Sequence, residues 1–558
     1  MKAIDLYCGI GGWSLGLEHA GVKVVGAYEL WQPAITTYQN NLGTAPHRVD
    51  IRKLSNSDLP EGIDLVVGSP PCTQFSYSNR GGSGDVSDGL VDIRKFLEIV
   101  DFVKPKFWIM ENVPRVARAV RESMELGGND CLIPFRHLFS DFGGSGRIET
   151  LTLSDFGVPQ KRKRCFIGNI NFELLRSYRS ELPRFTLGET LDALHSTPEC
   201  MDLVYGLSRL SNNVTDNEIE PYLNPEECRL NRDSKSFHPV YNMMRFPEEL
   251  DAPVRTITAT CTRVSRESVV IEAPELAGKS RFRRLTVRER GILQGFPIDF
   301  QFFGSSYSHR LKMIGNALPP PMAYYIAQAI KGIKPDDLRK LNDGSIKLRK
   351  VCNVPKKLSP DQQGKSYPTY RRFRAAVPNL RFGSGVRYEL ANECTRSSLD
   401  PMWAIKFFFG PSKSYTTVEL CQNMFDRLKR QSTLVQLCLT AKTEIENMNV
   451  EIDQKTGDEL QANWNKSIPS LAGPFEIVDR LGELASSLTK AIRANRSIDI
   501  NEASRILHAE FSRWDNQLST QRLEKSGYEI LAGAILASAF NAYSCVCASE
   551  DRNDELAA

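Results

Sequence analysis

Short apolar runs alternate with longer amphipathic stretches in the first third of the chain. Continuous apolar runs predict buried strands, and apolar residues spaced three or four positions apart predict helices. Strands that alternate with helices predict an α/β fold with a doubly wound, mostly parallel sheet, whose ligands bind beyond the carboxyl ends of the strands. The expected strands are residues 3–7, 22–29, 63–68 and 107–112, and the expected helices include 13–21 and 92–105.

The alternation stops at about residue 170, and later parts of the chain have other patterns. Pro, Asn and Glu are frequent up to residue 282, which predicts an irregular region. Helical spacing returns at 285–297 and 319–333, and a mainly helical α+β pattern ends the chain. We expect five segments: 1–169, an α/β domain; 170–282, an irregular region; 283–335, a return to the first domain; 336–375, a basic linker or strip; and 376–558, an accessory domain of unknown role.

Composition excludes several classes of protein. With 41% hydrophobic and 25% charged residues, the chain is typical of soluble globular proteins, and a net charge of +4 identifies no partner. No apolar run approaches the roughly 18–20 residues that span a bilayer. The N-terminus enters a strand pattern at once, which leaves no room for a signal peptide. We therefore expect a cytoplasmic protein without a membrane partner.

The cysteines and histidines predict no metal site. The 13 cysteines are scattered without Cys-x-x-Cys spacing, which favours reduced thiols, and the chain has only 7 histidines.

A glycine-rich turn, DLYCGIGG at residues 5–12, follows the first expected strand. Glycines let backbone N–H groups approach a ligand closely where a helix begins. The turn differs from the dinucleotide fingerprint, because Ser14 stands where that pattern has glycine. Glu29 ends the next strand, where a carboxylate would hold ribose hydroxyls, and Asp50 could reach an adenine amino group from the third strand end. A packing turn beside a solvated carboxylate is the alternative interpretation.

Four further side chains are candidates for chemistry. Cys72 lies in GSPPCTQFS, after the strand at 63–68, where active sites form in such sheets. Glu111 ends another strand, and a carboxylate there costs stability unless it meets a partner or a ligand. Arg162 and Arg164 alternate in QKRKR on an expected strand, so both side chains should point the same way. The structural alternatives are a buried cysteine and an exposed basic edge.

In order and spacing, these motifs resemble the cytosine-C5 DNA methyltransferase family. The resemblance spans residues 1 to about 332, and residues 170–282 correspond to the family's variable target-recognition region. Residues 314–330, which return to the first domain, should pack against the start of the chain. The motifs that carry the resemblance are DLYCGIGG, the acidic strand ends, PPC, ENV, QKRKR, RRLT…QGFP and GNALPPP.

The resemblance implies covalent catalysis on a cytosine that is flipped out of the duplex. Cys72 would add to C6 of the base, because a thiolate is strongly nucleophilic and can leave again. Glu111 would hold or protonate N3, Arg164 would contact the O2 edge, and Arg162 would support Glu111 or the cysteine loop. The methyl donor would be S-adenosylmethionine, and no metal is needed.

The resemblance also implies a set of cofactor-binding residues, which line the glycine turn, the acidic strand ends and the final motif. They are Tyr7, Gly9, Ile10, Gly11, Gly12, Glu29, Asp50, Ile51, Pro71, Asn316 and Ala317.

The expected partner is double-stranded DNA, bound by a monomer, and a cognate restriction or defence protein is a further expectation. In a prokaryote the protein would lie at the nucleoid. Arg255 and Arg263 are candidate groove or phosphate contacts, and exposed arginines on a surface loop are the alternative.

Two features depart from the family. Thr73 follows the cysteine, where the family usually has Gln, so the contact that closes on flipped DNA is open. The family accounts for nothing beyond about residue 335. Two other functions are weighed: methylation of tRNA cytosine with the same residues, and a catalytically silent DNA-binding regulator. The intact Cys72, Glu111 and Arg164 argue against the second.

Overall fold

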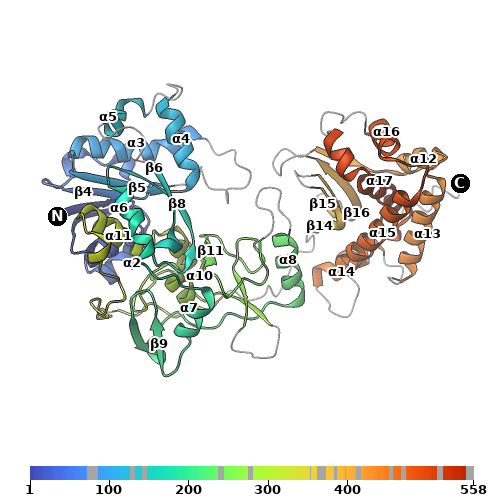
Figure 1. Cartoon of the computed structure of the whole chain (residues 1–558). Coiled ribbons are helices and arrows are strands. Elements are labelled where there is room, and N and C mark those ends of the chain that lie inside the picture. The colour runs from blue at the N-terminus through green and yellow to red at the C-terminus, as the bar shows by residue number, and fades with distance from the viewer. Residues whose placement is uncertain are drawn as a thin grey trace. The chain divides into compact units, whose positions relative to one another are not determined.

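The structure is a computed structural model of the chain (Figure 1). The chain divides into two compact units, one formed by residues 1–237 and 243–363 and the other by 238–242 and 364–558. Cys72 and Thr73 lie outside the described residues. The structure describes residues 1–71, 86–125, 132–140, 148–236, 244–273, 281–351, 353–360, 372–382, 386–395, 398–409, 416–451, 456–466, 473–511 and 520–547.

A seven-stranded sheet forms the centre of the first unit (Figure 1). The strand order is β3-β2-β1-β4-β5-β8-β6, with parallel pairing from β3 to β5 and antiparallel pairing at β8 and β6. The expected doubly wound, mostly parallel α/β fold is therefore confirmed. The strands are β1 (Lys2–Leu6), β2 (Lys23–Glu29), β3 (His47–Arg48), β4 (Leu65–Gly68), β5 (Phe107–Asn112), β6 (Ile148–Thr152) and β8 (Lys163–Gly168).

Helices cover both faces of this sheet, because successive strand residues point to opposite faces. Val66 and Trp108 belong to one apolar core, which α3 and α4 complete. Leu65 and Ile109 belong to the other core, which α1 and α11 complete. The helices of the first domain are α1 (Gly12–His19), α2 (Gln32–Leu42), α3 (Val86–Val103), α4 (Pro114–Glu125), α5 (His137–Ser140) and α11 (Pro320–Ile330).

Helix α11 brings late residues of the chain back to α1. A side chain on Gly12 would meet the carbonyl oxygen of Leu318 at 2.0 Å, so this close approach requires glycine. One turn further along α1, a side chain on Gly16 would meet the carbonyl oxygen of Pro320 at 2.2 Å. The expectation that residues 314–330 pack against the start of the chain is confirmed.

Residues 170–282 form short elements, joined to the first domain by the parallel pairing of β11 with β7. Largely buried side chains connect this region to residues 283–335: Arg284 pairs with Glu220 at 2.6 Å, and Nε2 of His195 lies 2.7 Å from Glu289, which also pairs with Arg283 at 2.8 Å. The elements from β7 to α10 are β7 (Gln160–Lys161), α6 (Phe172–Ser177), α7 (Leu187–Leu194), β9 (Glu199–Asp202), β10 (Leu207–Leu210), α8 (Pro225–Ser236), β11 (Val254–Arg255), β12 (Val270–Glu272), β13 (Phe282–Arg284), α9 (Val287–Leu293) and α10 (Tyr307–Asn316).

Residues 338–351 and 353–357, which we call the strap, pack on the first unit, although they follow the last family motif. Leu341 is 3% exposed and belongs to the core beneath α11. Arg349 donates a hydrogen bond to the carbonyl of Asn41 at 2.8 Å, and Arg310 donates one to the carbonyl of Lys356. The first half of the stretch expected to be a basic linker or strip is thus part of the fold of the first unit.

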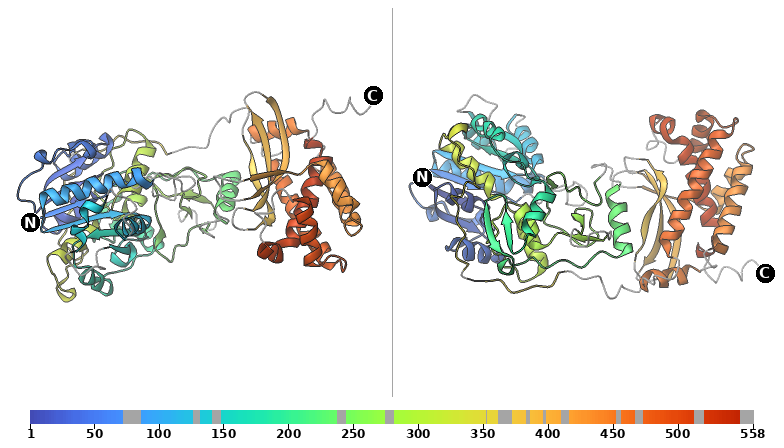
Figure 2. Two further views of the ribbon diagram at one scale, coloured as in Figure 1. Left: turned by 90° about the horizontal axis from the view of Figure 1, so that it is seen from above. Right: turned by 60° about the horizontal axis from the view of Figure 1, so that its bottom comes forward.

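The second unit consists of a four-stranded antiparallel sheet and helices. The strand order is β14-β15-β16-β17, and the helices that the structure describes lie on one side of this sheet (Figure 2). Its elements are β14 (Arg374–Arg381), β15 (Arg387–Thr395), β16 (Ser398–Phe409), β17 (Thr416–Glu419), α12 (Gln422–Arg430), α13 (Val435–Glu451), α14 (Gly457–Lys466), α15 (Pro474–Ala494), α16 (Ile500–Glu510) and α17 (Thr520–Tyr543).

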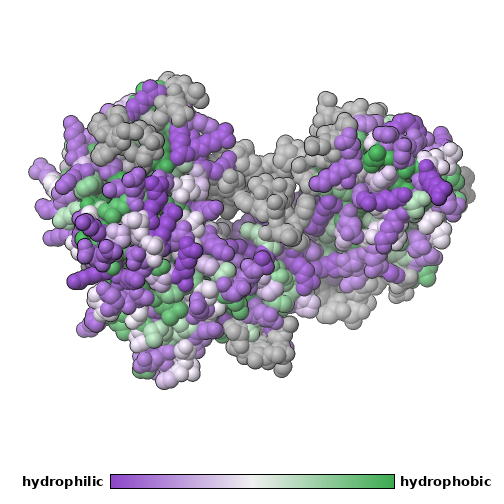
Figure 3. All heavy atoms as spheres, viewed as in Figure 1, coloured by the Kyte–Doolittle hydropathy of each residue, from purple (hydrophilic) through white to green (hydrophobic). Residues whose placement is uncertain are grey.

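Hydrophilic residues predominate on the face of the molecule in Figure 3, with apolar residues scattered among them. Among the described residues, no helix has the length and apolar character needed to cross a membrane.

We predict that Leu341→Ala destabilises the first unit by about 2–5 kcal/mol, because it removes a buried side chain and leaves a cavity. Leu348→Ala is the matched control on the same strap, since Leu348 is 45% exposed; its effect should stay within about 0.5 kcal/mol. The measurement is urea unfolding, with hydrogen exchange of peptides from α1 and α11 to assign the transition to the first unit. Equal stabilities of the two variants would mean that the strap is only a linker.

Candidate active site

The carboxyl ends of β1, β2, β4 and β5 meet at one edge of the first unit's sheet, because these strands are parallel neighbours. The residues that end or follow these strands are therefore brought together. They include the glycine turn after β1, Glu29 at the end of β2, Ser69 to Pro71 after β4 and Glu111 near the end of β5.

The glycine turn places an open backbone surface at this edge. Tyr7 and Gly9 have φ values of 56° and 55°, and no atom lies within 4 Å of a Cβ built on Gly9, so a ligand can approach the backbone there. Gly11, with φ 92°, is the N-cap residue of α1. Gly12 lies against Leu318, so close packing is the reason that this position requires glycine. Ile10 is 1% exposed and lies in an apolar core.

Glu29 accepts hydrogen bonds from three backbone N–H groups. They belong to Gly9 at 2.9 Å, Leu30 at 2.9 Å and Trp31 at 2.8 Å. These bonds fix the carboxylate between the glycine turn and the start of α2, where its remaining lone pairs can accept hydroxyl groups.

Asp50 begins the short helix η1 (Ile51–Lys53) at the end of β3. Its carboxylate accepts the N–H of Arg52 at 3.1 Å, and Ile51 is 3% exposed. The acid and the apolar residue expected to flank an adenine are therefore adjacent at the same edge.

Asp5 lies beneath the glycine turn and is completely buried. Its carboxylate accepts the hydroxyl of Ser14 at 2.6 Å, and the hydroxyl of Tyr38 donates to Ser14 at 2.9 Å. Burial raises the pKa of Asp5 to about 7, against the lowering effect of the Ser14 hydrogen bonds. A polar residue inside an apolar strand is the signal that could have identified Asp5 from the sequence.

Glu111 and Arg164 form a buried ion pair. The Nε atom of Arg164 lies 2.8 Å from Oε1 of Glu111, and the two side chains are 12% and 7% exposed. Antiparallel pairing of β5 with β8 sets Glu111 opposite Phe166, two residues after Arg164. The structure thus brings together two of the residues expected in the site, with the arginine ready to stabilise negative charge beside the carboxylate.

Arg162 and Arg164 have different partners, which contradicts the expectation that both point the same way. Arg162 stands between β7 and β8, where strand alternation is broken. Its guanidinium donates to the carbonyl groups of Ile257 at 3.1 Å, Gly315 at 3.0 Å and Ala317 at 3.3 Å. Arg162 therefore joins the irregular region at 170–282 to the final motif.

A second side chain holds the final motif, GNALPPP, at Ala317. Gln294 donates to the carbonyl of Ala317 at 2.5 Å and accepts from Gln160 at 2.7 Å. Ala317 is 8% exposed, and Asn316 is exposed.

Trp13 and Asn112 anchor the segment that leads to Cys72, a role that the sequence did not predict for either residue. Trp13 donates to the hydroxyl of Ser69 at 3.1 Å, and Asn112 donates to the carbonyl of Pro70 at 3.0 Å. Pro71 is exposed, and the next residue, Cys72, is the first outside the described part of the chain. Asn112 therefore links the Glu111 strand to the start of this segment.

The sequence suggested that Arg255 and Arg263 contact DNA or lie on a surface loop, and both interpretations require exposed side chains. Neither side chain is exposed. Arg263 is 7% exposed and bonds both carboxylate oxygens of Glu227, at 2.6 and 2.7 Å. Arg255 pairs with Glu248 at 2.8 Å, and burial lowers the pKa of its guanidinium. Both arginines therefore stabilise the irregular region at 170–282 internally.

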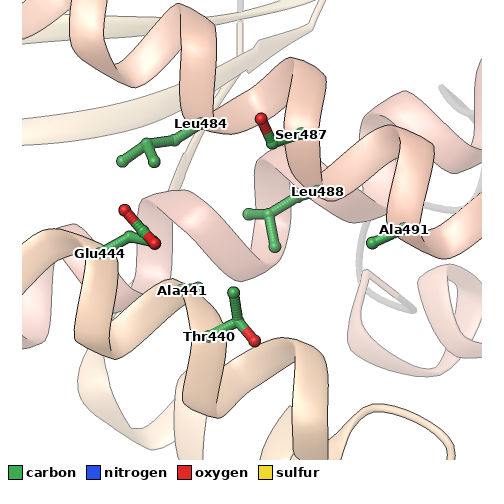
Figure 4. A pocket seen from close by; sticks show the side chains of 7 residues that line it. All are labelled: Thr440, Ala441, Glu444, Leu484, Ser487, Leu488 and Ala491. Carbon is green, nitrogen blue, oxygen red and sulfur yellow. The ribbon is translucent and has the colours of Figure 1, made fainter.

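Figure 4 shows a small pocket of about 170 Å³ between α13 and α15 of the second unit. Glu444 is the single carboxylate in its lining, beside Thr440, Ser487 and apolar side chains. A lone carboxylate lacks the acid–base partner seen at the sheet edge of the first unit, so we place the candidate site in the first unit.

Comparisons with known proteins agree with this placement. The family model of C-5 cytosine-specific DNA methylases matches residues 1–332. The type II methyltransferase M.NgoPII of Neisseria gonorrhoeae is 30% identical over 349 residues, covering 59% of this chain and 95% of the relative. M.HindV of Haemophilus influenzae, also a type II methyltransferase, is 30% identical over 349 residues, covering 61% of this chain and 100% of the relative.

Solved structures are also similar. The Dnmt2 methyltransferase of S. pombe has 17% sequence identity and a TM-score of 0.42, covering 60% of this chain and 98% of that chain.

The family match and the two relatives define the first unit as an α/β enzyme of the methyltransferase class. The chain belongs to the C-5 cytosine-specific DNA methylase family, whose model covers more than half of it. It is a DNA (cytosine-5-)-methyltransferase.

We predict that Asp5→Asn changes how stability depends on pH. The folded pKa of about 7 lies above the value near 4 in an unfolded chain. The stability from protonated Asp5 is therefore complete below about pH 4 and is lost as the pH rises through 7. Because Asn does not titrate, the difference in unfolding free energy, Asp5→Asn minus wild type, should rise between pH 5 and about 8 by roughly 1–4 kcal/mol.

Urea unfolding at a series of pH values measures this difference. Glu61→Gln, which changes an exposed side chain in the same unit, is the control and should run parallel to wild type. An Asp5→Asn curve that also runs parallel would show that Asp5 is already ionised in the folded protein.

Proposed function

We propose that the protein transfers a methyl group from S-adenosylmethionine to C5 of cytosine in a specific double-stranded DNA sequence, through a covalent bond between Cys72 and C6. The observation that supports this best is the buried pair of Glu111 and Arg164. It stands at the carboxyl edge of the sheet, and Asn112 joins it to the segment that leads to Cys72.

The residues at the sheet edge fit the cofactor. Glu29 presents a fixed carboxylate for the ribose hydroxyls, Asp50 and Ile51 flank the proposed adenine position, and the open backbone at Gly9 admits the methionine end. Tyr7, Ile10, Gly11, Pro71, Asn316 and Ala317 complete the proposed site. When bound, S-adenosylmethionine supplies an activated methyl group.

In the proposed mechanism, the target cytosine leaves the base stack at a cost of a few kcal/mol. The Cys72 thiolate forms a bond to C6, and Glu111 holds or protonates N3, so that electron density moves to C5. Arg164 stabilises charge at O2, a fixed electrostatic role. C5 takes up the methyl group, and loss of the C5 proton then breaks the C6–S bond and releases Cys72. Arg162 has a structural role, because its hydrogen bonds fix the turn at residues 315–317.

Two comparisons support a role in modification: the similar proteins from N. gonorrhoeae and H. influenzae are type II methyltransferases. We propose that the chain acts as a monomer on DNA in the cytoplasm and that a cognate restriction or defence protein accompanies it. We assign residues 1–169 and 283–335 to the catalytic domain, 170–282 to target recognition, 336–375 to a basic strip whose first half packs on the first unit, and 376–558 to an accessory domain.

A labelled-methyl assay on unmethylated duplex DNA and on tRNA tests this function. We expect incorporation into DNA, at a sequence that bisulfite sequencing of DNA from expressing cells would then identify. Incorporation into tRNA alone would make the protein a tRNA methyltransferase, and binding of DNA without any incorporation would make it a silent regulator.

We predict that Cys72→Ser lowers methyl transfer by at least about a thousandfold while affinity for S-adenosylmethionine changes little, because the thiol acts only in the chemical step. Cys421→Ser is the matched control, since Cys421 is exposed in the second unit, and it should keep full activity. Single-turnover rates and calorimetric cofactor binding measure the two effects. Normal turnover by Cys72→Ser would exclude the covalent mechanism.

We predict that Glu111→Gln loses about 10²–10⁴-fold in single-turnover rate yet keeps its affinity for the DNA site, because the amide cannot exchange a proton at N3. Glu122→Gln on the neighbouring helix α4 removes an exposed ion pair with Arg118 and should leave the rate unchanged. Weak DNA binding at a full rate would instead mark Glu111 as a residue of the DNA-binding surface.

A further inference from the structure

The segment that contains Cys72 has two described flanks, and residues around the glycine turn contact both. On the first flank, Trp13 of α1 donates to the hydroxyl of Ser69 at 3.1 Å. On the second flank, α3 begins at Val86. In its second turn Asp92 accepts the hydroxyl of Tyr7 at 3.2 Å. The turn proposed to hold the cofactor thus contacts the chain before and after the proposed nucleophile.

Asp92 has a second partner, which comes from the proposed adenine position. The Nε and Nη2 atoms of Arg52 lie 2.9 and 2.7 Å from the two carboxylate oxygens of Asp92, a bidentate pair. Arg52 directly follows Asp50 and Ile51, and its own N–H bonds to Asp50 at 3.1 Å. One carboxylate therefore connects both walls of the proposed cofactor site to α3.

The burial of Asp92 makes these contacts energetically important. The residue is 5% exposed, and a buried carboxylate is costly unless hydrogen bonds and an opposite charge compensate it. Arg52 is 42% exposed in its side chain, so it can move with a ligand more easily than Asp92 can. Displacement of Tyr7 or Arg52 would leave the carboxylate under-compensated, and a shift of α3 is one way to relieve that cost.

We propose that Asp92 is a positioning residue which, through Tyr7 and Arg52, couples cofactor binding to the position of α3. This inference rests on the proposed function, because Tyr7 and Asp50 are the residues proposed to bind S-adenosylmethionine. A bound cofactor holds Tyr7 and Arg52 in one geometry, which favours one position of α3. Coupling of this kind requires that the ligand interact differently with the alternative conformations.

Hydrogen exchange of the full chain, with S-adenosylhomocysteine as the probe ligand, tests the coupling without DNA. Calorimetry first measures the affinity of each protein, and exchange is then followed at saturating ligand. The variants are Tyr7→Phe, which removes only the hydroxyl, Asp92→Asn, and Arg52→Gln at a partly exposed position.

Two control variants lose comparable contacts elsewhere. Tyr324→Phe removes a tyrosine hydroxyl that donates to the carbonyl of Arg339 at 3.0 Å. Glu98→Gln removes the partner of Lys95 on the same helix α3.

In wild type and both controls, the ligand should slow exchange in peptides from 8–20 and, by at least about fivefold, in the first turns of α3. In Tyr7→Phe, Asp92→Asn and Arg52→Gln, the effect on peptides from 8–20 should remain, and the effect on α3 should fall below about twofold. Equal slowing of α3 in the variants, or none in wild type with ligand bound, would overturn the coupling. Failure of wild type to bind the ligand would overturn the proposed function and the coupling together.

Discussion

Burying charge at the carboxyl edge of a parallel sheet costs free energy unless each charged group has a partner. Glu111 meets this requirement through Arg164 at 2.8 Å, and Glu29 meets it through three backbone N–H groups. Each partner comes from a different segment: β8 for Glu111, and the glycine turn and the start of α2 for Glu29. The edge is therefore ordered only when these segments are folded around it, and pairing still leaves oxygen atoms that can bind a substrate.

The segments around this edge are held in place by contacts that span the chain. Gly12 allows the carbonyl of Leu318 to approach, which brings the final motif to the glycine turn. Arg162 and Gln294 then hold the carbonyl group of Ala317 in place. The strap adds Leu341 to the same core, although it follows the last family motif. The first unit is thus one compact structure built from sequence-distant parts, and the strap belongs to it.

The sequence predicted the features that depend on local pattern. The four strands were placed within two residues because their apolar runs are short and bounded by polar residues, and Glu111 was placed at a strand end. Arg162 was misplaced because the strand breaks beside it, which alternation does not reveal. Arg263 was misread because its partner, Glu227, lies 36 positions earlier in the chain. Asp92 and the strap were missed because their contacts with Arg52 and Asn41 bridge about 40 and about 300 residues, and no local pattern encodes such pairings.

The most direct test of covalent catalysis uses duplex DNA that carries 5-fluorocytosine at the target position. Fluorine cannot leave C5 as a proton does, so the bond between the enzyme and C6 should persist after methyl transfer. Wild-type protein with S-adenosylmethionine should form an adduct of one protein with one duplex, and peptide mass analysis should place the bond on Cys72. An enzyme that methylates ordinary DNA yet forms no adduct, or an adduct on another residue, would contradict the assignment of Cys72.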